Sequence, residues 1–458
     1  MKTHPLCTIL LFFAGAAFSQ SLPTVPGAQV TTLTPTPGYF SEPSVAVNPR
    51  NPQQIVAAYQ VTATVAYSAD AGRTWTNSAN TAPKNFKVSG DVSIAYDSQG
   101  QAVLCYIAFD KLGTTNYWAH NATRNGIFVR RSVDGGKTWE PEDSSVIQHP
   151  TVPGIPFEDK PYIVADTTNG PFSGNLYVGW TEFSLIKTII LFSRSTDGGK
   201  TWSPPIEIST HEGLPRDDNG SVEGFTGAVA PDGSLYVVWA DGNNIAFTES
   251  TDGGRTFSPS RSIISTAPPY FDVADTSRSN GFPQIALDSR NDKSGSVLYV
   301  TWSDYRNGDV DVFCATSSDH GHTWSSPVRV NTDPVHNGAD QFFQWLAVDP
   351  ETGAAYVNFY DRRDDPANRK TRVVLARSAD GGKSFLNYLW PEPAFEAKEE
   401  FLGDYTGLAV QNGRVHAVWT EQRQAPPPRS STKAKALPKH HTIVRVGTAD
   451  FNSAKATP

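Results

Sequence analysis

The sequence STDGGKTW, residues 195–202, decides the fold because the chain repeats it. Five further copies, SADAGRTW, SVDGGKTW, STDGGRTF, SSDHGHTW and SADGGKSF, begin at Ser68, Ser132, Ser250, Ser317 and Ser378. In such an octad the aspartate can accept backbone N–H bonds two residues on, and glycine takes a position of positive φ. Each octad is therefore predicted to be a turn that joins two strands. Six copies at regular spacing indicate a repeat fold.

Short runs of alternating apolar and polar residues surround every octad, as expected for β-strands. Before STDGGKTW stand PYIVAD, LYVGWTE and ILFSRS, and PIEIST follows it. Four antiparallel strands in a unit of roughly sixty residues are the pattern of a β-propeller blade. We therefore predict an all-β chain that forms a single propeller over residues 28–452 and carries six Asp-containing octads.

The octads number six, whereas the opening strands of the units number seven. The last unit, DYTGLAV, VHAVWTEQ and TIVRVGTADF, lacks a fourth strand, and residues 30–34 near the N-terminus lack a unit of their own. This unassigned strand can complete the last blade, which closes the ring and hides its sheet edges. We predict seven four-stranded antiparallel blades closed by the N-terminal strand. A six-bladed ring is the alternative.

Two segments differ in composition from the repeats. Residues 1–19, MKTHPLCTILLFFAGAAFS, combine a basic start, a short apolar run and small residues, which is typical of a secretory signal peptide. We therefore expect a secreted or periplasmic protein with no membrane span. Residues 424–441, QAPPPRSSTKAKALPKHH, are rich in proline, lysine and serine, and are expected to form a flexible loop inside the last blade.

Charge and cysteine content exclude several classes of function. With 38 basic and 46 acidic residues, the net charge of −8 argues against nucleic acid as a partner. Cys105 and Cys314 fall in apolar strands of different units, which predicts buried free thiols rather than a disulfide or a metal site. No cofactor is predicted, and a structural Ca²⁺ ion is the one metal that the acidic residues suggest. We expect a monomer.

Acidic residues stand at or just before most of the opening strands, where the loops of a propeller meet its central channel. The predicted set comprises Glu42, Asp91, Asp159, Glu223, Asp340 and Asp404, and blade five offers Asn280 instead. Crowded carboxyl groups raise the pKa of some members or recruit a cation, so this set is a candidate for acid–base chemistry. The alternative is that these side chains cap strand ends by accepting N–H bonds from loops.

A second motif ends three second strands, as WSDYR (302–306), FYDRR (359–363) and WTEQR (419–423). It aligns three arginines, Arg306, Arg363 and Arg423, each with an acid two residues earlier, Asp304, Asp361 and Glu421. Guanidinium groups that converge on a cleft form a clamp for carboxylate or sulfate. An ion pair inside each blade is the alternative.

The octad resembles the Asp-box, or BNR repeat, of the sialidase superfamily, and the resemblance covers nearly the whole chain at the level of the repeat. In that superfamily three arginines hold the substrate carboxylate, a tyrosine with a glutamate is the nucleophile, and an aspartate is the acid/base. Sialidases are the tyrosine exception among glycosidases. The resemblance implies a glycoside hydrolase that acts on an extracellular glycan or polysaccharide.

Carried over by motif, GDYTGLAV implies that Tyr405 takes the place of the nucleophilic tyrosine. Tyr405 is predicted to be the nucleophile or a substrate contact, and the acidic set offers Asp159 or Asp404 as acid/base. FYDRR implies that Arg362 or Arg363 belongs to the clamp. Gln344 stands near the expected glutamate, and Ser41 stands where that family has an arginine. The prediction is therefore cleavage of a glycan, sialidase-like on an acidic sugar or by another hydrolysis on the same face. The alternative is a non-catalytic propeller that binds a glycan or protein partner.

Overall fold

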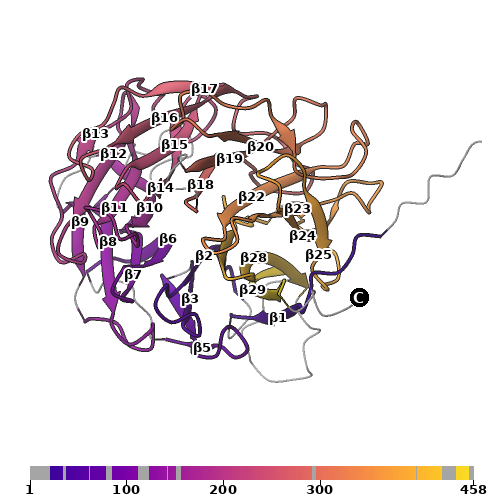
Figure 1. The fold of residues 1–458 in the computed structure, drawn as a ribbon, viewed down its shortest axis with the longest axis horizontal. Coiled ribbons are helices and arrows are strands. Elements are labelled where there is room, and N and C mark those ends of the chain that lie inside the picture. The colour runs from indigo at the N-terminus through magenta and orange to yellow at the C-terminus, as the bar shows by residue number, and fades with distance from the viewer. Residues whose placement is uncertain are drawn as a thin grey trace, which may run out of the picture.

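The computed structural model describes residues 21–34, 38–60, 62–78, 85–111, 123–141, 143–150, 156–290, 296–398, 400–424 and 440–452. Seven antiparallel sheets surround a central axis (Figure 1). The predicted seven-bladed propeller is confirmed, and the six-bladed alternative is wrong. The described ranges contain strands and turns but no helix, and so no helix that could cross a bilayer. Most of residues 424–441 and all of residues 1–19 lie outside these ranges.

Each blade is one sheet, and in blades one to six four successively paired strands follow the chain from the axis outward (Figure 1). In blade seven the outermost strand comes from the N-terminal segment. Blade one contains β2 (Ser41–Val47), β3 (Ile55–Gln60), β4 (Thr64–Ser68) and β5 (Thr76–Asn77). Blade two contains β6 (Val88–Tyr96), β7 (Ala102–Phe109), β8 (Asn125–Ser132) and β9 (Ser144–His149). Blade three contains β10 (Phe157–Ala165), β11 (Leu176–Phe183), β12 (Thr188–Ser195) and β13 (Ile206–Glu207). Blade four contains β14 (Val222–Val229), β15 (Leu235–Asp241), β16 (Asn244–Ser250) and β17 (Arg261–Ser265).

The remaining blades complete the ring. Blade five contains β18 (Gln284–Asp288), β19 (Val297–Asp304), β20 (Asp311–Ser317) and β21 (Val328–Arg329). Blade six contains β22 (Gln341–Val348), β23 (Ala355–Asp361), β24 (Lys370–Ser378), β25 (Leu386–Leu389) and the short β26 (Phe395–Glu396), which also pairs with β24. Blade seven contains β27 (Gly407–Gln411), β28 (Arg414–Gln424), β29 (His440–Asp450) and the N-terminal strand β1 (Gln29–Thr32).

The N-terminal segment closes the ring and also ties two blades together. β1 pairs antiparallel with β29, with Val30 opposite Gly447, and the Leu33 N–H donates to the Val444 carbonyl at 2.9 Å. Upstream, the segment runs along the outer edge of blade six, where the Val25 N–H donates to the Leu389 carbonyl at 3.0 Å. The first and last parts of the chain therefore share one sheet, as predicted.

The octads lie at the end of each blade away from the starts of the opening strands, and their hydrogen bonds explain the repeat. In residues 195–202, the Ser195 hydroxyl accepts the Gly199 N–H at 2.9 Å and donates to the Asp197 carboxylate at 2.8 Å. Asp197 accepts the Thr201 N–H at 2.9 Å and the Lys200 N–H at 3.0 Å. The aspartate thus bonds three and four residues on, rather than two as expected from an ordinary Asx turn.

Glycine in the octad is required by packing as well as by conformation. Gly136 has a φ of 89°, and a Cβ there would lie 2.3 Å from a methyl group of Val56 in the preceding blade. The octad turn therefore fits against the neighbouring sheet only when it carries no side chain. This contact explains why a turn sequence recurs with the period of the blade.

The apolar core consists of seven clusters, and each lies between two neighbouring blades. The cluster between blades seven and one joins Val45 and Ile55 to Val418 and Val444, so the ring is closed by packing as well as by pairing. Single blades cannot bury both faces alone, so the ring folds as one unit. Cys105 and Cys314 are buried free thiols, as predicted.

Candidate functional site at the channel mouth

Five opening strands carry a β-bulge at the same register position, where they reach the axis. The register shifts lie in β2, β6, β10, β14 and β22. The bulged residues all have positive φ, and they are Glu42, Asp91, Lys160, Gly224 and Phe343. Left-handed backbone is unfavourable for residues with a Cβ, and bulges commonly re-aim side chains beside functional sites. Here Glu42 and Lys160 contact residues of other blades.

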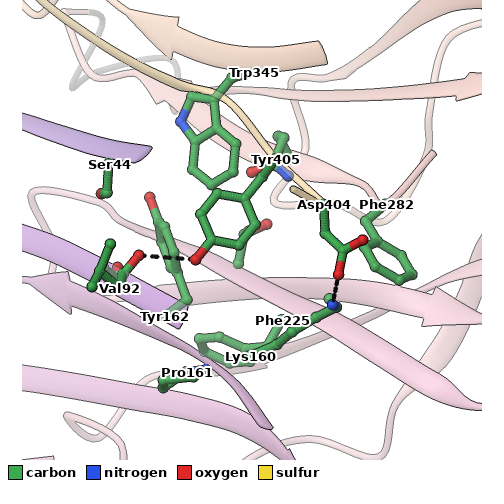
Figure 2. A pocket seen from close by; sticks show the side chains of 14 residues that line it. Ser44, Val92, Lys160, Pro161, Tyr162, Phe225, Phe282, Trp345, Asp404 and Tyr405 are labelled. Carbon is green, nitrogen blue, oxygen red and sulfur yellow. Dashed lines mark hydrogen bonds and ion pairs between the residues drawn. The ribbon is translucent and has the colours of Figure 1, made fainter. Parts of the chain in front are cut away.

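Asp404, in the loop before β27, is the centre of a buried charge cluster. The cluster lies at the end of the central channel where the opening strands begin, which is called the mouth below. The Lys160 ammonium pairs with Asp404 (Figure 2), and its nitrogen also lies 3.3 Å from a Glu223 oxygen. The Arg278 Nε donates to Asp404 Oδ1 at 2.8 Å, and a second guanidinium nitrogen contacts the other oxygen. The Asn280 amide donates to Asp404 Oδ1 at 3.2 Å. Blade three and the loop before blade five therefore meet at the Asp404 carboxylate of blade seven, and blade four joins them through the contact of Glu223 with Lys160.

A second carboxylate group extends the cluster through Arg278 and Tyr270. Arg278 pairs with Asp217, and the Tyr270 hydroxyl lies 2.5 Å from an Asp217 oxygen and 3.0 Å from Glu223 Oε2. A phenol has a single proton to donate. Both contacts are satisfied together only if one of the two carboxyl groups carries a proton.

The pKa values in the cluster diverge because acids outnumber bases. Two cations, Lys160 and Arg278, face six carboxyl groups, those of Glu42, Asp91, Asp159, Asp217, Glu223 and Asp404. Burial, with Asp217 close by, raises the pKa of Glu223 to about 8. Burial and the charge of Asp404 likewise raise the pKa of Glu42 to about 8.

The pKa values of two further carboxyl groups are also raised, whereas the pKa of Asp404 is lowered. Burial raises the pKa of Asp159 and of Asp91 well above the usual range, and the charges of neighbouring acids add to it, that of Asp91 for Asp159 and that of Glu42 for Asp91. Burial also acts to raise the pKa of Asp404, but Arg278 and Lys160 outweigh it and lower that pKa. At neutral pH the mouth therefore holds an ionised aspartate beside protonated neighbours.

Protein stability should depend on pH through these groups. A carboxyl group whose folded pKa exceeds its unfolded value stabilises the fold below the unfolded pKa and loses that contribution as pH rises through the folded pKa. For Glu223 and Glu42 this window runs from 4.5 to about 8. The free energy of unfolding should therefore fall from pH 5 to pH 8.5, by at most about 1.4 kcal/mol per pH unit for each group.

Urea denaturation of Glu223→Gln across this pH range checks that expectation. The variant should equal the wild type near pH 5, where glutamine resembles the protonated acid, and should exceed it at pH 8.5. Glu207→Gln, on the exposed strand β13, is the matched control and should follow the wild type. Parallel curves for the wild type and Glu223→Gln would contradict the raised pKa.

Tyr405 lies at the mouth without the glutamate partner that the family resemblance implies. Its hydroxyl donates to the Val92 carbonyl at 3.1 Å, and its ring lies 5.9 Å from that of Trp345 (Figure 2). Gln344 accepts the Ser303 hydroxyl at 2.5 Å and donates to the Phe282 carbonyl at 2.7 Å, so it joins blades five and six. Burial raises the pKa of Tyr405 far above its usual range.

Two cavities adjoin the cluster and differ greatly in size. The one beneath Tyr405, Lys160 and Asp404 has a volume of about 40 Å³ (Figure 2), enough for a few water molecules. The other, beside Arg278 and Tyr270, has a volume of about 670 Å³ and admits a ligand of several rings. Glu223 and Asp404 have side chains that are 0% exposed, so a ligand reaches them only through neighbouring groups.

The three arginines of the second motif do not converge on the mouth, contrary to the predicted clamp. Arg306 pairs with Asp304, Arg363 with Asp361, and Arg423 with Glu421, each within its own blade. Asp304 and Glu421 also accept an indole N–H, from Trp302 at 2.9 Å and from Trp419 at 2.8 Å. The geometry matches the alternative of an ion pair inside each blade, because an acid two residues before each arginine holds the guanidinium in place.

Arg362 is also placed away from the axis. Its side chain is fully buried over the Phe342 ring and donates to the carbonyls of Ala274 and Asn368 at 2.8 Å and 2.6 Å. Burial lowers the pKa of Arg362 to about 10. Arg362 therefore links blade six to the loop before blade five.

One group among the described residues has the composition of a cation site. His149, Glu158 and Glu182, between blades two and three, offer ligand atoms within 4.8 Å of one another. His149 contacts Glu158 at 2.6 Å, and the Trp180 indole donates to the other Glu158 oxygen at 2.6 Å. Burial and the neighbouring Glu158 raise the pKa of Glu182 to about 7. The mouth carboxylates do not form such a group within the described part of the chain.

The sequence motifs indicate the acids of the mouth, but not its cations, Lys160 and Arg278, or its phenol, Tyr270. Lys160 follows Asp159 directly, and its role depends on a bulge that no residue pattern marks. Arg278 and Tyr270 lie in the long loop before β18, and Asp217 lies in a polar stretch that precedes β14. Asn280 stands near the place where other blades carry an acid, and this exception together with the long loop is the sequence signal that blade five differs.

Comparison with known proteins agrees with this architecture. The BNR/Asp-box repeat family matches residues 193–204, which contain the octad of blade three. The chain is a seven-bladed β-propeller that carries a BNR/Asp-box repeat. The matched repeat is the octad that resembles the Asp-box in the sequence. No curated protein sequence matches the chain.

Solved structures that resemble this Asp-box propeller include several glycan-active enzymes. The phage phi92 endosialidase is 11% identical, with 95% of this chain and 71% of that chain covered and a TM-score of 0.54. A PL25 ulvan lyase is 11% identical, with 93% and 99% covered and a TM-score of 0.50. The microbial sialidase Hz136 is 15% identical, with 87% and 74% covered and a TM-score of 0.48. At such identities the similarity concerns the fold alone.

Proposed function

We propose that the protein is an exported glycoside hydrolase whose reaction takes place at the channel mouth. The observation that carries the proposal is the charge cluster, in which Lys160 and Arg278 keep Asp404 ionised while burial keeps Asp159 and its neighbours protonated. Glycoside hydrolysis needs such a division, because one carboxyl group gives a proton to the leaving oxygen and another acts as base or nucleophile.

In this proposal Asp159 gives its proton to the leaving glycosidic oxygen, and Asp404 stabilises the positive charge that develops on the sugar ring. A water molecule attacks the anomeric carbon, and its proton returns to the Asp159 carboxylate, which restores the acid. Tyr405, half-buried at the same mouth, contacts the substrate. Its raised pKa favours the neutral phenol, which can donate a hydrogen bond to a sugar oxygen. Export follows from the expectation for residues 1–19.

Sugar release from a glycan panel tests the proposal. The purified protein is incubated with sialosides, uronic-acid polysaccharides, neutral polysaccharides and amino-sugar polymers, and released reducing ends are measured. Asp159→Asn should lower the rate by about 10²- to 10⁴-fold, the usual contribution of a general acid. Asp232→Asn, on the face opposite the mouth, should leave the rate unchanged. Release that is unaffected by Asp159→Asn would contradict the assignment.

Burial at the mouth favours a second candidate, a propeller that binds a glycan without cleaving it. The fully buried side chains of Asp404 and Glu223 and the small cavity beside them restrict direct contact with a substrate. In that case the panel yields no release, while binding to one of the same glycans is retained. The two candidates therefore give opposite results in one experiment.

A further inference from the structure

The larger cavity beside the charge cluster has the size of a ligand site. Its volume of about 670 Å³ falls in the range of small-molecule pockets, about 300–1,000 Å³. It is lined by the polar stretch before blade four, the loop before blade five, the β19–β20 loop and the segment before blade six. Arg278, Tyr270 and Asp217 belong both to this groove and to the cluster, so the two sites are continuous.

The groove is strongly acidic. Five aspartates line it, namely Asp217, Asp218, Asp272, Asp309 and Asp340. Arg278 is the one basic side chain in its lining, and Asp404 and Asp217 already pair with that guanidinium. An anionic sugar would therefore meet excess negative charge and no free cation. A cationic ligand would be attracted.

Asp309 gives independent evidence that a hydrogen-bond donor belongs in the groove. The residue is only 8% exposed, and its Oδ2 accepts the Gly338 N–H at 2.8 Å. Its Oδ1 is buried and has no hydrogen-bond partner. A buried carboxylate oxygen without a partner is costly, and a donor on a ligand would remove that cost.

Aromatic side chains complete the groove. Tyr305 is 41% exposed, and its ring packs edge-to-face against Phe271 with centroids 6.3 Å apart. An exposed aromatic face offers apolar contact to a sugar ring and attracts a cation through its π-electrons. Aspartates with an aromatic platform thus match a ligand that is both ring-shaped and positively charged.

We propose that this groove binds a saccharide with protonated amino groups, a glucosamine polymer in chemical class, and excludes sialic and uronic acids. An ammonium group carries three donors and satisfies Asp309 Oδ1 while Asp272 and Asp217 supply long-range attraction. The inference rests on the proposed function for the choice of a sugar. It changes the expected substrate from an acidic glycan to a cationic one.

Calorimetric titration tests the inference with defined probes at low salt. These are the β-1,4-linked glucosamine hexamer, the N-acetylglucosamine hexamer, 3′-sialyllactose and tetralysine. The glucosamine hexamer should bind at least about tenfold more tightly than its acetylated form and should weaken as salt screens the charges. Asp309→Asn and the exposed Asp272→Asn should each weaken it about fivefold or more. Asp232→Asn, on the opposite face, should not.

The outcomes separate this inference from the proposed hydrolysis. Equal binding of the acetylated hexamer, preferential binding of sialyllactose, or tetralysine binding as tightly as the glucosamine hexamer would overturn the inference. Binding is measured without turnover, so a protein that prefers the glucosamine hexamer but releases no sugar supports the inference and contradicts hydrolysis. A hydrolase that cleaves only sialosides overturns the inference and leaves the hydrolysis in place.

Discussion

Replacing Asp404 with asparagine is expected to lower the free energy of unfolding by about 3–5 kcal/mol, the usual cost of leaving a buried charge without its partner. Asp404 is the shared counter-ion of Lys160 and Arg278, and the side chains of Asp404 and Lys160 are 0% and 6% exposed. Asparagine keeps the shape but not the charge. Chemical denaturation measures the loss, and activity on any glycan that the wild type cleaves should disappear with it.

A second substitution and a matched control sharpen this prediction. Adding Lys160→Met to Asp404→Asn should recover part of the stability, because it removes the unpaired ammonium. Asp275→Asn breaks an exposed pair with Arg369, whose side chain is 57% exposed, and should cost less than about 1 kcal/mol. Similar losses for Asp404→Asn and Asp275→Asn would show that the cluster is not buried as described.

Removal of residues 1–34 is expected to prevent stable folding of the ring. The segment buries Val25 and Leu33, at 2% and 4% exposure, each contributing about 1.5–3 kcal/mol. It also supplies the β1 ladder and the bonds to Leu389 and Val444. The summed loss is comparable to the stability of a typical domain, about 5–15 kcal/mol. It also leaves the edge of β29 unpaired and prone to aggregation.

The matched control is a chain that starts at Ser21, which keeps every described contact. Thermal unfolding and size-exclusion chromatography compare the two proteins. The longer one should elute as a compact species and unfold cooperatively, whereas the shorter one should aggregate or melt at a much lower temperature. If the shorter chain matches the longer one in both measurements, β1 does not close the ring.

The fold was predictable because its signals are local and repeated. Each octad turn depends on side chains within seven residues, such as Ser195, Asp197 and Thr201, so one short stretch of sequence determines the whole turn. The seventh blade could be inferred because the last unit lacks a strand and residues 30–34 provide one. Six octads at regular spacing also predict the fold more strongly than a single octad does.

The site was only partly predictable because it is built from residues that are distant in sequence. The acids Glu42, Asp91, Asp159, Glu223 and Asp404 all stand close to the start of an opening strand, which made them visible. The cations do not repeat: Lys160 points to the axis through a bulge, and Arg278 comes from a loop whose length is unique to blade five. The spacing of acid and arginine in the second motif could not distinguish an arginine clamp from an ion pair within each blade. Both arrangements place the arginine at the same strand end.

The account depends on carboxyl groups at one mouth being held in different protonation states. A ¹³C NMR titration of the glutamate carboxyl groups measures this directly, with the Glu42 and Glu223 signals assigned from Glu42→Gln and Glu223→Gln. The predicted result is that both signals titrate near pH 8, in line with pKa values raised to about 8. Titration of both signals below pH 5, as for exposed glutamates, would contradict the account.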